Sequence, residues 1–142
     1  MKKLVILSDL HVPEHDEAAL DAALRVVAHE RPDEVILNGD VLELLSVSSY
    51  GESGGLTKEL DECRRFLQRV RRAAPKAKLT WCEGNHETRL WRWIQQHAGG
   101  LNGALTLPKE LNLGALGVEW IPEDAQPSKR GRLLILHGHQ IS

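Results

Sequence analysis

The amino-acid sequence predicts an α/β fold with a parallel-rich sheet built from βαβ units. Continuous apolar runs such as Leu4–Leu7 and Val35–Leu37 are typical of parallel strands covered on both faces. A stretch with helical spacing of its apolar residues separates these two runs, as a βαβ crossover requires. Side chains that bind metals or move protons follow directly after four of the apolar runs. In open α/β sheets, ligands bind at the loops that follow the carboxyl ends of the strands.

The first strand is expected at residues 4–7. Asp16 is the expected N-cap of a helix that reaches about Glu30. The apolar positions of this helix keep helical spacing, at Ala19, Leu20, Ala23, Leu24 and Val27. Pro32 ends the helix, and the second buried strand follows at residues 35–37.

A loop rich in serine and glycine, residues 46–55, follows the second strand and contains the only tyrosine, Tyr50. It is interpreted either as a substrate-facing loop or as a mobile surface connection. Thr57 is the expected cap of a second helix that reaches about Ala74, with a buried stripe of Leu60, Cys63, Leu67, Val70 and Ala74. The other faces of this helix carry Arg64, Arg65, Arg69, Arg71 and Arg72. A solvated face is the more frequent reason for such a basic run, and contact with nucleic acid is the alternative.

Residues 78–82 are expected to form the third strand, and residues 87–97 a third helix that ends before Gly99. Trp91, Trp93 and Ile94 of this helix are interpreted as including core contacts rather than as a recognition surface.

Beyond the third helix the pattern is less regular. A helical turn is expected near residues 109–112, and strands are expected at residues 117–121 and 132–136, separated by a polar connection. Because no internal repeat, low-complexity tract or interdomain linker interrupts the chain, a single domain over residues 1–142 is expected.

The composition is that of an ordinary globular domain. Its 142 residues include 20 acidic and 18 basic side chains, so the net charge neither favours nor excludes a polyanionic partner. Two cysteines, Cys63 and Cys82, provide no disulfide framework. The apolar run near the N-terminus is too short for a signal peptide, and no stretch approaches membrane-spanning length. A cytoplasmic location without a membrane partner is therefore expected.

Four short motifs at the ends of apolar runs carry residues typical of metal sites. These residues are Asp9, His11, Asp40, Asn85, His86, Glu87, His137 and His139. In the third motif, Gly84 allows a tight turn and Asn85 offers an amide oxygen. His86 offers an imidazole that binds a metal or moves a proton near neutral pH, and Glu87 is placed to orient it.

The donor atoms of these motifs form a mixed set of oxygen and nitrogen ligands. Such a set suits Mn, Fe, Zn or Co better than Ca or Mg. Asp9 and His11 lie on the same side of an extended segment, so both can reach one ion. Asp40 can bridge two ions because a carboxylate has two oxygens, and Asn85 and His137 then serve the second ion. Two ions about 3.5–4 Å apart can activate a water and clamp the oxygens of an in-line displacement.

Arg89 follows His86 by one helical turn and is the expected substrate-binding residue. Its guanidinium either binds a phosphate, whose geometry it matches, or pairs with a neighbouring acid. The sequence contains no Ser–His–Asp order and no Walker-type Gly-Lys-Ser/Thr that would indicate a different chemistry.

Asp9-Leu10-His11, Gly39-Asp40, Gly84-Asn85-His86-Glu87 and His137-Gly138-His139 occur in this order along the chain. Together they resemble four of the five motifs of the calcineurin-like metallophosphoesterase superfamily, and the likeness spans nearly the whole chain. The resemblance implies a phosphatase or phosphodiesterase with two divalent ions on a four-layered αββα sandwich. Manganese is the expected metal, with iron, zinc or cobalt as alternatives.

The resemblance also implies a role for each motif residue. Asp9 and His11 would bind the first ion and Asp40 would bridge, while Asn85 and His137 would bind the second ion. A further implication is that His86 is catalytic rather than ligating, either as acid to the leaving oxygen or as a group that stabilises the transferred phosphoryl. Glu87 would orient His86.

The fifth motif of the family, Gly-His-x-His, is where this sequence departs from the pattern. Ile141 stands where the second histidine is expected, and His139 follows His137 directly instead of lying further along the chain. The chain is therefore expected to be a family domain without its last strands. Water, His139 or a residue of another chain would complete the metal ligands. A missing strand leaves an exposed sheet edge, which favours self-association.

Two functions remain as alternatives. The first is a dinuclear-metal phosphoesterase that hydrolyses phosphomonoester or phosphodiester bonds with a metal-activated water. The second is a catalytically weak or inactive module that keeps the fold and serves in metal binding or assembly. The intact pair of His86 and Glu87 favours the first, and the absent fifth motif favours the second. A nuclease-like role is compatible with the first alternative, although no strong basic patch or stacking platform in the sequence demands it.

Overall fold

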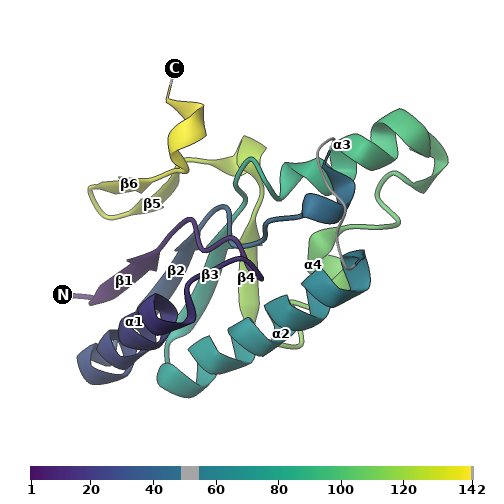
Figure 1. The fold of residues 1–142 in the computed structure, drawn as a ribbon. Helices are drawn as coiled ribbons and strands as arrows, with labels where there is room; N and C mark the ends of the chain where they lie inside the picture. Colours follow the sequence, from purple (N-terminus) through teal and green to yellow (C-terminus); the bar gives the residue numbers. More distant parts are fainter. Residues whose placement is uncertain (49–54, 142) are drawn as a thin grey trace.

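The computed structural model describes residues 1–48 and 55–141. A parallel sheet with the strand order β1-β2-β3-β4 forms its centre (Figure 1). The strands are β1 (Leu4–Leu7), β2 (Glu34–Asn38), β3 (Lys78–Cys82) and β4 (Val118–Ile121). Leu37 pairs with Trp81, which pairs in turn with Trp120. The predicted α/β class and the positions of the first three strands are confirmed.

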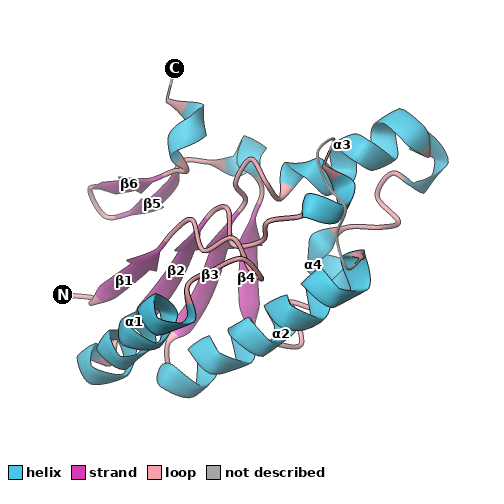
Figure 2. Cartoon of the chain, viewed as in Figure 1, coloured by secondary structure: helices cyan, strands magenta, loops and turns pink. Residues whose placement is uncertain are grey.

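Two long helices, α1 (Glu17–Glu30) and α2 (Leu56–Ala73), lie along one face of this sheet (Figure 2). Their apolar sides and the side chains of alternate strand residues form the main core, which includes Leu24, Val27, Cys63, Leu67, Val35, Leu37 and Trp81. Asp16 caps α1 as predicted, because its carboxylate accepts the Ala19 N–H over 2.9 Å. The predicted cap Thr57 is wrong, since α2 begins at Leu56 after Gly55.

A short antiparallel hairpin covers the opposite face of the sheet. It consists of β5 (Ser128–Arg130) and β6 (Leu133–Ile135) and packs on the sheet through Ile36, Cys82 and Ile135. The predicted strand at residues 132–136 therefore exists, but it belongs to a second sheet. Over the described residues the layers are helices, parallel sheet and hairpin, which correspond to the first three layers of the expected αββα order.

A buried ion pair fastens the hairpin to the sheet. The Glu34 carboxylate lies on the hairpin side of β2 and accepts from Arg130 Nε over 2.8 Å and from a terminal Arg130 nitrogen over 2.6 Å. The Thr80 hydroxyl donates to the same carboxylate over 2.6 Å. Arg130 lowers the pKa of Glu34 by hydrogen bonding and charge, against the effect of burial.

The rest of the chain is arranged around α3 (Thr88–His97), which follows β3, and α4 (Leu107–Glu110). The short 3₁₀ turns η1 (Leu45–Val47), η2 (Gly99–Leu101), η3 (Glu123–Ala125) and η4 (Gly138–Gln140) connect these elements. Ile94 is buried as predicted, whereas Trp91 and Trp93 are not core contacts, because each side chain is 43% exposed. Thr88 and Leu90 form the rest of the buried side of α3.

Three further expectations concern the loop around Tyr50, the two cysteines and membrane-spanning segments. Tyr50 and most of its loop lie outside the described residues. Cys63 and Cys82 are both buried and free, as the absence of a disulfide framework predicted. In the described ranges, every helix is too short or too polar to cross a bilayer.

Candidate metal centre

The loops that follow β1 and β2 run side by side at the carboxyl ends of the strands (Figure 1). The Asp9 N–H donates to the Gly39 carbonyl over 3.1 Å, and the His11 N–H donates to the Asp40 carbonyl over 3.0 Å. The φ angles of Asp9, His11 and Asp40 are 56°, 54° and 50°, in the left-handed region that side chains rarely adopt. Such strained residues cluster at functional sites, where the surrounding fold holds side chains in the geometry that the function needs.

A first group of candidate ligands contains Asp9, Asp40 and His137. His137 Nε2 lies 3.4 Å from Asp40 Oδ2 and 3.9 Å from Asp9 Oδ1. The other ring nitrogen, Nδ1, lies 2.8 Å from the Asn38 carbonyl oxygen, which can only accept, so the ring donates its Nδ1–H there. This bond leaves the lone pair on Nε2, which is the tautomer that a metal ligand needs.

A second group contains His11, Glu43 and His86. His11 Nδ1 lies 2.7 Å from Glu43 Oε2, and His86 Nδ1 lies 3.4 Å from the same oxygen. His11 is thus grouped apart from Asp9, whereas the sequence pattern places both on one ion. Sequence reasoning missed Glu43, whose only signal is a carboxylate three positions after Asp40.

Asp40 connects the two groups. Its Oδ2 lies 3.4 Å from His137 Nε2 and 3.8 Å from His86 Nε2. Its Oδ1 accepts the backbone N–H of His86 over 2.8 Å, which fixes the carboxylate between the loops after β2 and β3. One buried oxygen therefore faces both groups, which is the position that a bridging ligand needs.

The atoms around His137 fit a divalent cation. His137 Nε2 lies 3.1 Å from Asn85 Oδ1, and the carboxylates of Asp9 and Asp40 lie nearby. With its Nδ1 facing the Asn38 carbonyl, His137 directs Nε2 toward the amide oxygen and the carboxylates. In the neutral ring these atoms can bind one cation together, and the mixed oxygen and nitrogen set suits Mn, Fe, Zn or Co.

Glu87 holds the site loops together rather than orienting His86. Its buried carboxylate accepts the N–H groups of Asp40 over 2.9 Å, Leu42 over 3.0 Å and Gly84 over 2.7 Å. Burial raises the pKa of Glu87 to about 7, and the three N–H donors oppose this effect. Glu87 is therefore a positioning residue that fixes the loops after β2 and β3 relative to each other, which differs from the contact that the sequence resemblance implied.

Two glycines allow the site loops to approach each other closely. A Cβ atom added to Gly84 would lie 2.4 Å from the Asp40 nitrogen and 2.5 Å from Asp40 Oδ1. A Cβ atom added to Gly39, whose φ is 81°, would lie 2.5 Å from His137 Nδ1. Neither position has room for a side chain, so both glycines are required by the packing of the candidate ligands.

His86 and Arg89 contact each other at the edge of the second group. His86 Nδ1 lies 3.1 Å from the Glu43 carbonyl oxygen, and its Nε2 lies 3.0 Å from a guanidinium nitrogen of Arg89. Because the carbonyl can only accept and arginine can only donate, the ring is neutral with its proton on Nδ1. Burial lowers the pKa of His86, in part offset by the nearby Asp40 carboxylate. Arg89 also lies 3.7 Å from Glu43 Oε1, so it pairs with an acid in this structure.

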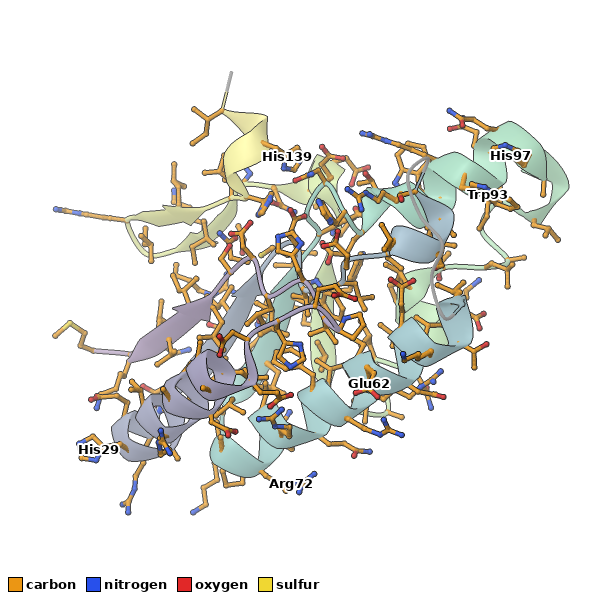
Figure 3. The ribbon with its side chains drawn as sticks, viewed as in Figure 1. His29, Glu62, Arg72, Trp93, His97 and His139 are labelled. Carbon is orange, nitrogen blue, oxygen red and sulfur yellow. The ribbon has the colours of Figure 1, made fainter. Side chains whose placement is uncertain are left out.

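His139 lies at the rim of the site on η4 (Figure 3). Its Nε2 is 2.7 Å from Glu123 Oε1, and its ring centroid is 5.1 Å from that of His137. Over the described residues, His139 belongs to neither ligand group. The predicted site residues that the fold does bring together are Asp9, His11, Asp40, Asn85, His86 and His137.

Comparison with known proteins identifies the family of the chain. A model of the calcineurin-like phosphoesterase family matches residues 2–142. The chain is also similar to the Gene 54 protein of Mycobacterium phage L5, with 26% identity over 132 residues, and to the Gene 54 protein of Mycobacterium phage D29, with 26% identity over 139 residues. Each match covers 86% of this chain and 51% of the relative, so the chain spans about half the length of these relatives. The family match extends over almost every residue and includes all the candidate ligands, and the chain therefore belongs to the calcineurin-like phosphoesterase family.

Proposed function

We propose that this chain is a metal-dependent phosphoesterase that uses two divalent ions to hydrolyse phosphomonoester or phosphodiester bonds. The observation that carries the proposal is the position of Asp40 Oδ2, which lies 3.4 Å from His137 Nε2 and 3.8 Å from His86 Nε2. Each group offers both carboxylate and imidazole donors, and this oxygen of the first group also faces His86 of the second. Family membership supports a phosphoester as the substrate.

Asp9, Asn85 and His137 are the proposed ligands of one ion, and His11 with Glu43 is proposed for the other, with Asp40 between them. Manganese is the proposed metal, and iron, zinc and cobalt share its preference for mixed oxygen and nitrogen ligands. When bound, two such ions lower the pKa of a water and neutralise charge on the phosphoryl oxygens.

Arg89 and His86 are the proposed residues that act on the substrate. The Arg89 guanidinium is partly exposed and matches the geometry of two phosphate oxygens. When Arg89 turns to a phosphate, His86 Nε2 loses its present donor and is free to face the leaving oxygen. The negative phosphate favours the protonated imidazole, which can then give its Nε2 proton to the leaving group.

Two substitutions separate metal binding from proton transfer. Asp40→Asn removes the charge of the shared carboxylate and is expected to lower metal content and turnover together. His86→Ala is expected to keep the metal content and to lower the rate constant by about 10²–10⁴-fold. Elemental analysis gives the metal content, and hydrolysis of a bis-aryl phosphodiester in added Mn²⁺ gives the rate. His29→Ala, at the exposed end of α1, is the control and should change neither value.

Loss of metal from the His86→Ala variant would contradict the proposed role of His86. If His86→Ala strips the metal and leaves the activity per bound ion unchanged, His86 is a ligand of the second group and the proposed proton transfer is wrong.

The second candidate function is a metal-binding module without turnover. It is favoured by His139, which pairs with Glu123, and by Ile141, which occupies the position of a family histidine and is 72% exposed. Metal binding by the wild-type chain without hydrolysis of either a phosphomonoester or a phosphodiester would support this candidate over the enzyme.

A further inference from the structure

The helix α3 begins beside the candidate metal centre and carries an unusual set of exposed side chains. It begins directly after His86 and Glu87 and contains two arginines, two tryptophans and no acidic residue. Trp91 and Trp93 are each 43% exposed, although burial is the usual state of such large aromatic side chains. The two rings therefore lie at the surface beside the two arginines of the same helix.

The two tryptophans face different surroundings. Trp93 lines a groove of about 400 Å³, here called the α3 groove, together with Arg89, Arg92, Gln96 and His97 of α3 and with Val47 and Ser48. This volume lies within the range of sites that hold small organic groups. No carboxylate is present among the described residues that line the α3 groove. Trp91 instead lines a separate pocket of about 440 Å³ that also contains Glu83, Glu123 and Asp124.

Arg89 connects the α3 groove to the candidate metal centre. It lines the groove and also lies 3.0 Å from His86 Nε2. From Arg89 to His97 the helix extends about 12 Å, so the groove leads well beyond the reach of a single phosphate. Glu43 lies at its inner end, 3.7 Å from Arg89 Nη1, and already pairs with His11.

An aromatic surface is already formed at the outer end of the α3 groove. The rings of Trp93 and His97 stack with a centroid distance of 4.6 Å and an interplanar angle of 17° (Figure 3). Stacked aromatic rings next to arginines are the features by which proteins bind single-stranded nucleic acid, since the bases stack on the rings and the phosphates pair with the cations. A base in a duplex cannot reach such a ring without being unpaired.

We propose that the α3 groove binds single-stranded nucleic acid and leads its phosphodiester backbone to the metal centre. In this arrangement a base stacks on Trp93, Arg92 pairs with a backbone phosphate, and Arg89 receives the phosphate that is to be cleaved. The carboxylates beside Trp91, which include Glu83, Glu123 and Asp124, repel a polyanion, and this directs the strand to the Trp93 side of α3. The proposal rests on the proposed phosphoesterase function and names its substrate class.

Binding of fluorescein-labelled 12-nucleotide single strands of DNA and of RNA to the full chain, followed by fluorescence anisotropy, tests this proposal without requiring turnover. Trp93→Ala is expected to weaken the binding by about fivefold or more, the effect of losing one stacked base. Trp93→Phe keeps an aromatic face and should restore most of the affinity. Trp91→Ala is the comparison on the same helix, with the same exposure; it removes only the ring over which the Arg92 guanidinium lies at 5.7 Å, and it should weaken binding clearly less than Trp93→Ala does.

The salt dependence of binding tests the contribution of charge. Arg92→Ala should reduce the slope of log K against log salt by about 0.7, the value for one phosphate contact with a single strand. Arg72→Ala, at the exposed end of α2 and far from α3 (Figure 3), should leave the slope unchanged.

Three results would overturn the proposal: no binding of either strand by the wild type, equal effects of Trp93→Ala and Trp91→Ala, or tighter binding of the duplex than of the single strands. Selective loss of a protein partner on Trp93→Ala, with unchanged oligonucleotide binding, would also overturn it by assigning the surface to a protein. Hydrolysis of a small phosphodiester tests the phosphoesterase function separately. Hydrolysis without binding of a single strand would refute only the proposed role of the α3 groove. Absence of hydrolysis would refute the proposed phosphoesterase function.

Discussion

At the scale of single residues, the candidate metal centre depends on places where a side chain is absent. Gly84 lies against Asp40 and Glu87, and an added Cβ would come within 2.4 Å of the Asp40 nitrogen and 2.9 Å of Glu87 Oε2. These neighbours are a backbone group and two buried carboxylates, which cannot move aside without disturbing the shared ligand.

Gly84→Ala is therefore expected to destabilise the fold by about 1–3 kcal/mol, the typical effect of overpacking, and to weaken metal binding. Urea unfolding and a Mn²⁺ titration of the refolded variant measure the two effects. Gly114→Ala provides the control, because a Cβ atom at that position meets nothing within 4 Å. Equal stability of the two variants would mean that the loops around Asp40 are less tightly packed than the structure indicates.

The sequence allowed most of the candidate ligands to be identified, for a physical reason. Asp9, Asp40 and Asn85 each follow a buried strand, and parallel strands bring their carboxyl ends to one edge of the sheet. Glu43 could not be found in this way, because it approaches His11 only after the chain has turned through a left-handed Asp40. The role of Glu87 was also beyond sequence reasoning, since its partners are backbone N–H groups, which every residue type shares.

At the scale of elements, the hairpin of β5 and β6 positions a candidate ligand of the proposed metal centre. β6 is followed by Leu136, whose carbonyl accepts from Asn38 Nδ2 over 3.1 Å, and then by His137. The hairpin is fastened to the sheet by the pair of Glu34 and Arg130. Loss of this pair therefore affects both the stability of the fold and the position of His137.

Glu34→Gln is expected to destabilise the fold by about 1–3 kcal/mol at neutral pH, the range for a buried hydrogen bond that involves charge. Because Arg130 lowers the pKa of folded Glu34 below its ordinary value of 4.5, the stabilisation is fully present above pH 4.5 and disappears as the pH falls through the folded pKa. The unfolding free energies of wild type and variant should thus differ at pH 7 and converge at low pH.

Urea unfolding between pH 3 and pH 7, as approximate limits, measures this convergence. Glu119→Gln on the neighbouring strand is the control, since Glu119 is 51% exposed and pairs with Lys78 at the surface, where such pairs contribute little. A difference between wild type and Glu34→Gln that does not change with pH would contradict the role given to the charge of Glu34.

The elements that sequence reasoning misplaced share one cause. The apolar run at residues 132–136 resembles a strand buried on both faces, yet Leu133 and Leu134 are 45% and 55% exposed in a two-stranded hairpin. Trp91 and Trp93 were assigned to the core by the same assumption. Apolar residue types favour burial, but the residue type alone does not show whether a given side chain lies in the core or on an exposed surface.

At the scale of the whole molecule, the order of strands and helices was predictable because each unit of strand and helix carries its own local pattern. The parallel sheet, its covering helices and the convergence of the loops all follow from those patterns. Self-association through a sheet edge stays a prediction. β1 lies at one end of the strand order, and Ile6 on this strand is 43% exposed.

The central claim is that two divalent ions bind on either side of Asp40 and support hydrolysis of a phosphoester. The most direct measurement is the number of Mn²⁺ ions bound per chain, determined by elemental analysis after equilibrium dialysis, with hydrolysis of a bis-aryl phosphodiester measured on the same sample. The predicted result is two ions per chain together with turnover. One ion or none, without turnover, would contradict the claim and leave a chain that keeps the family fold without its chemistry.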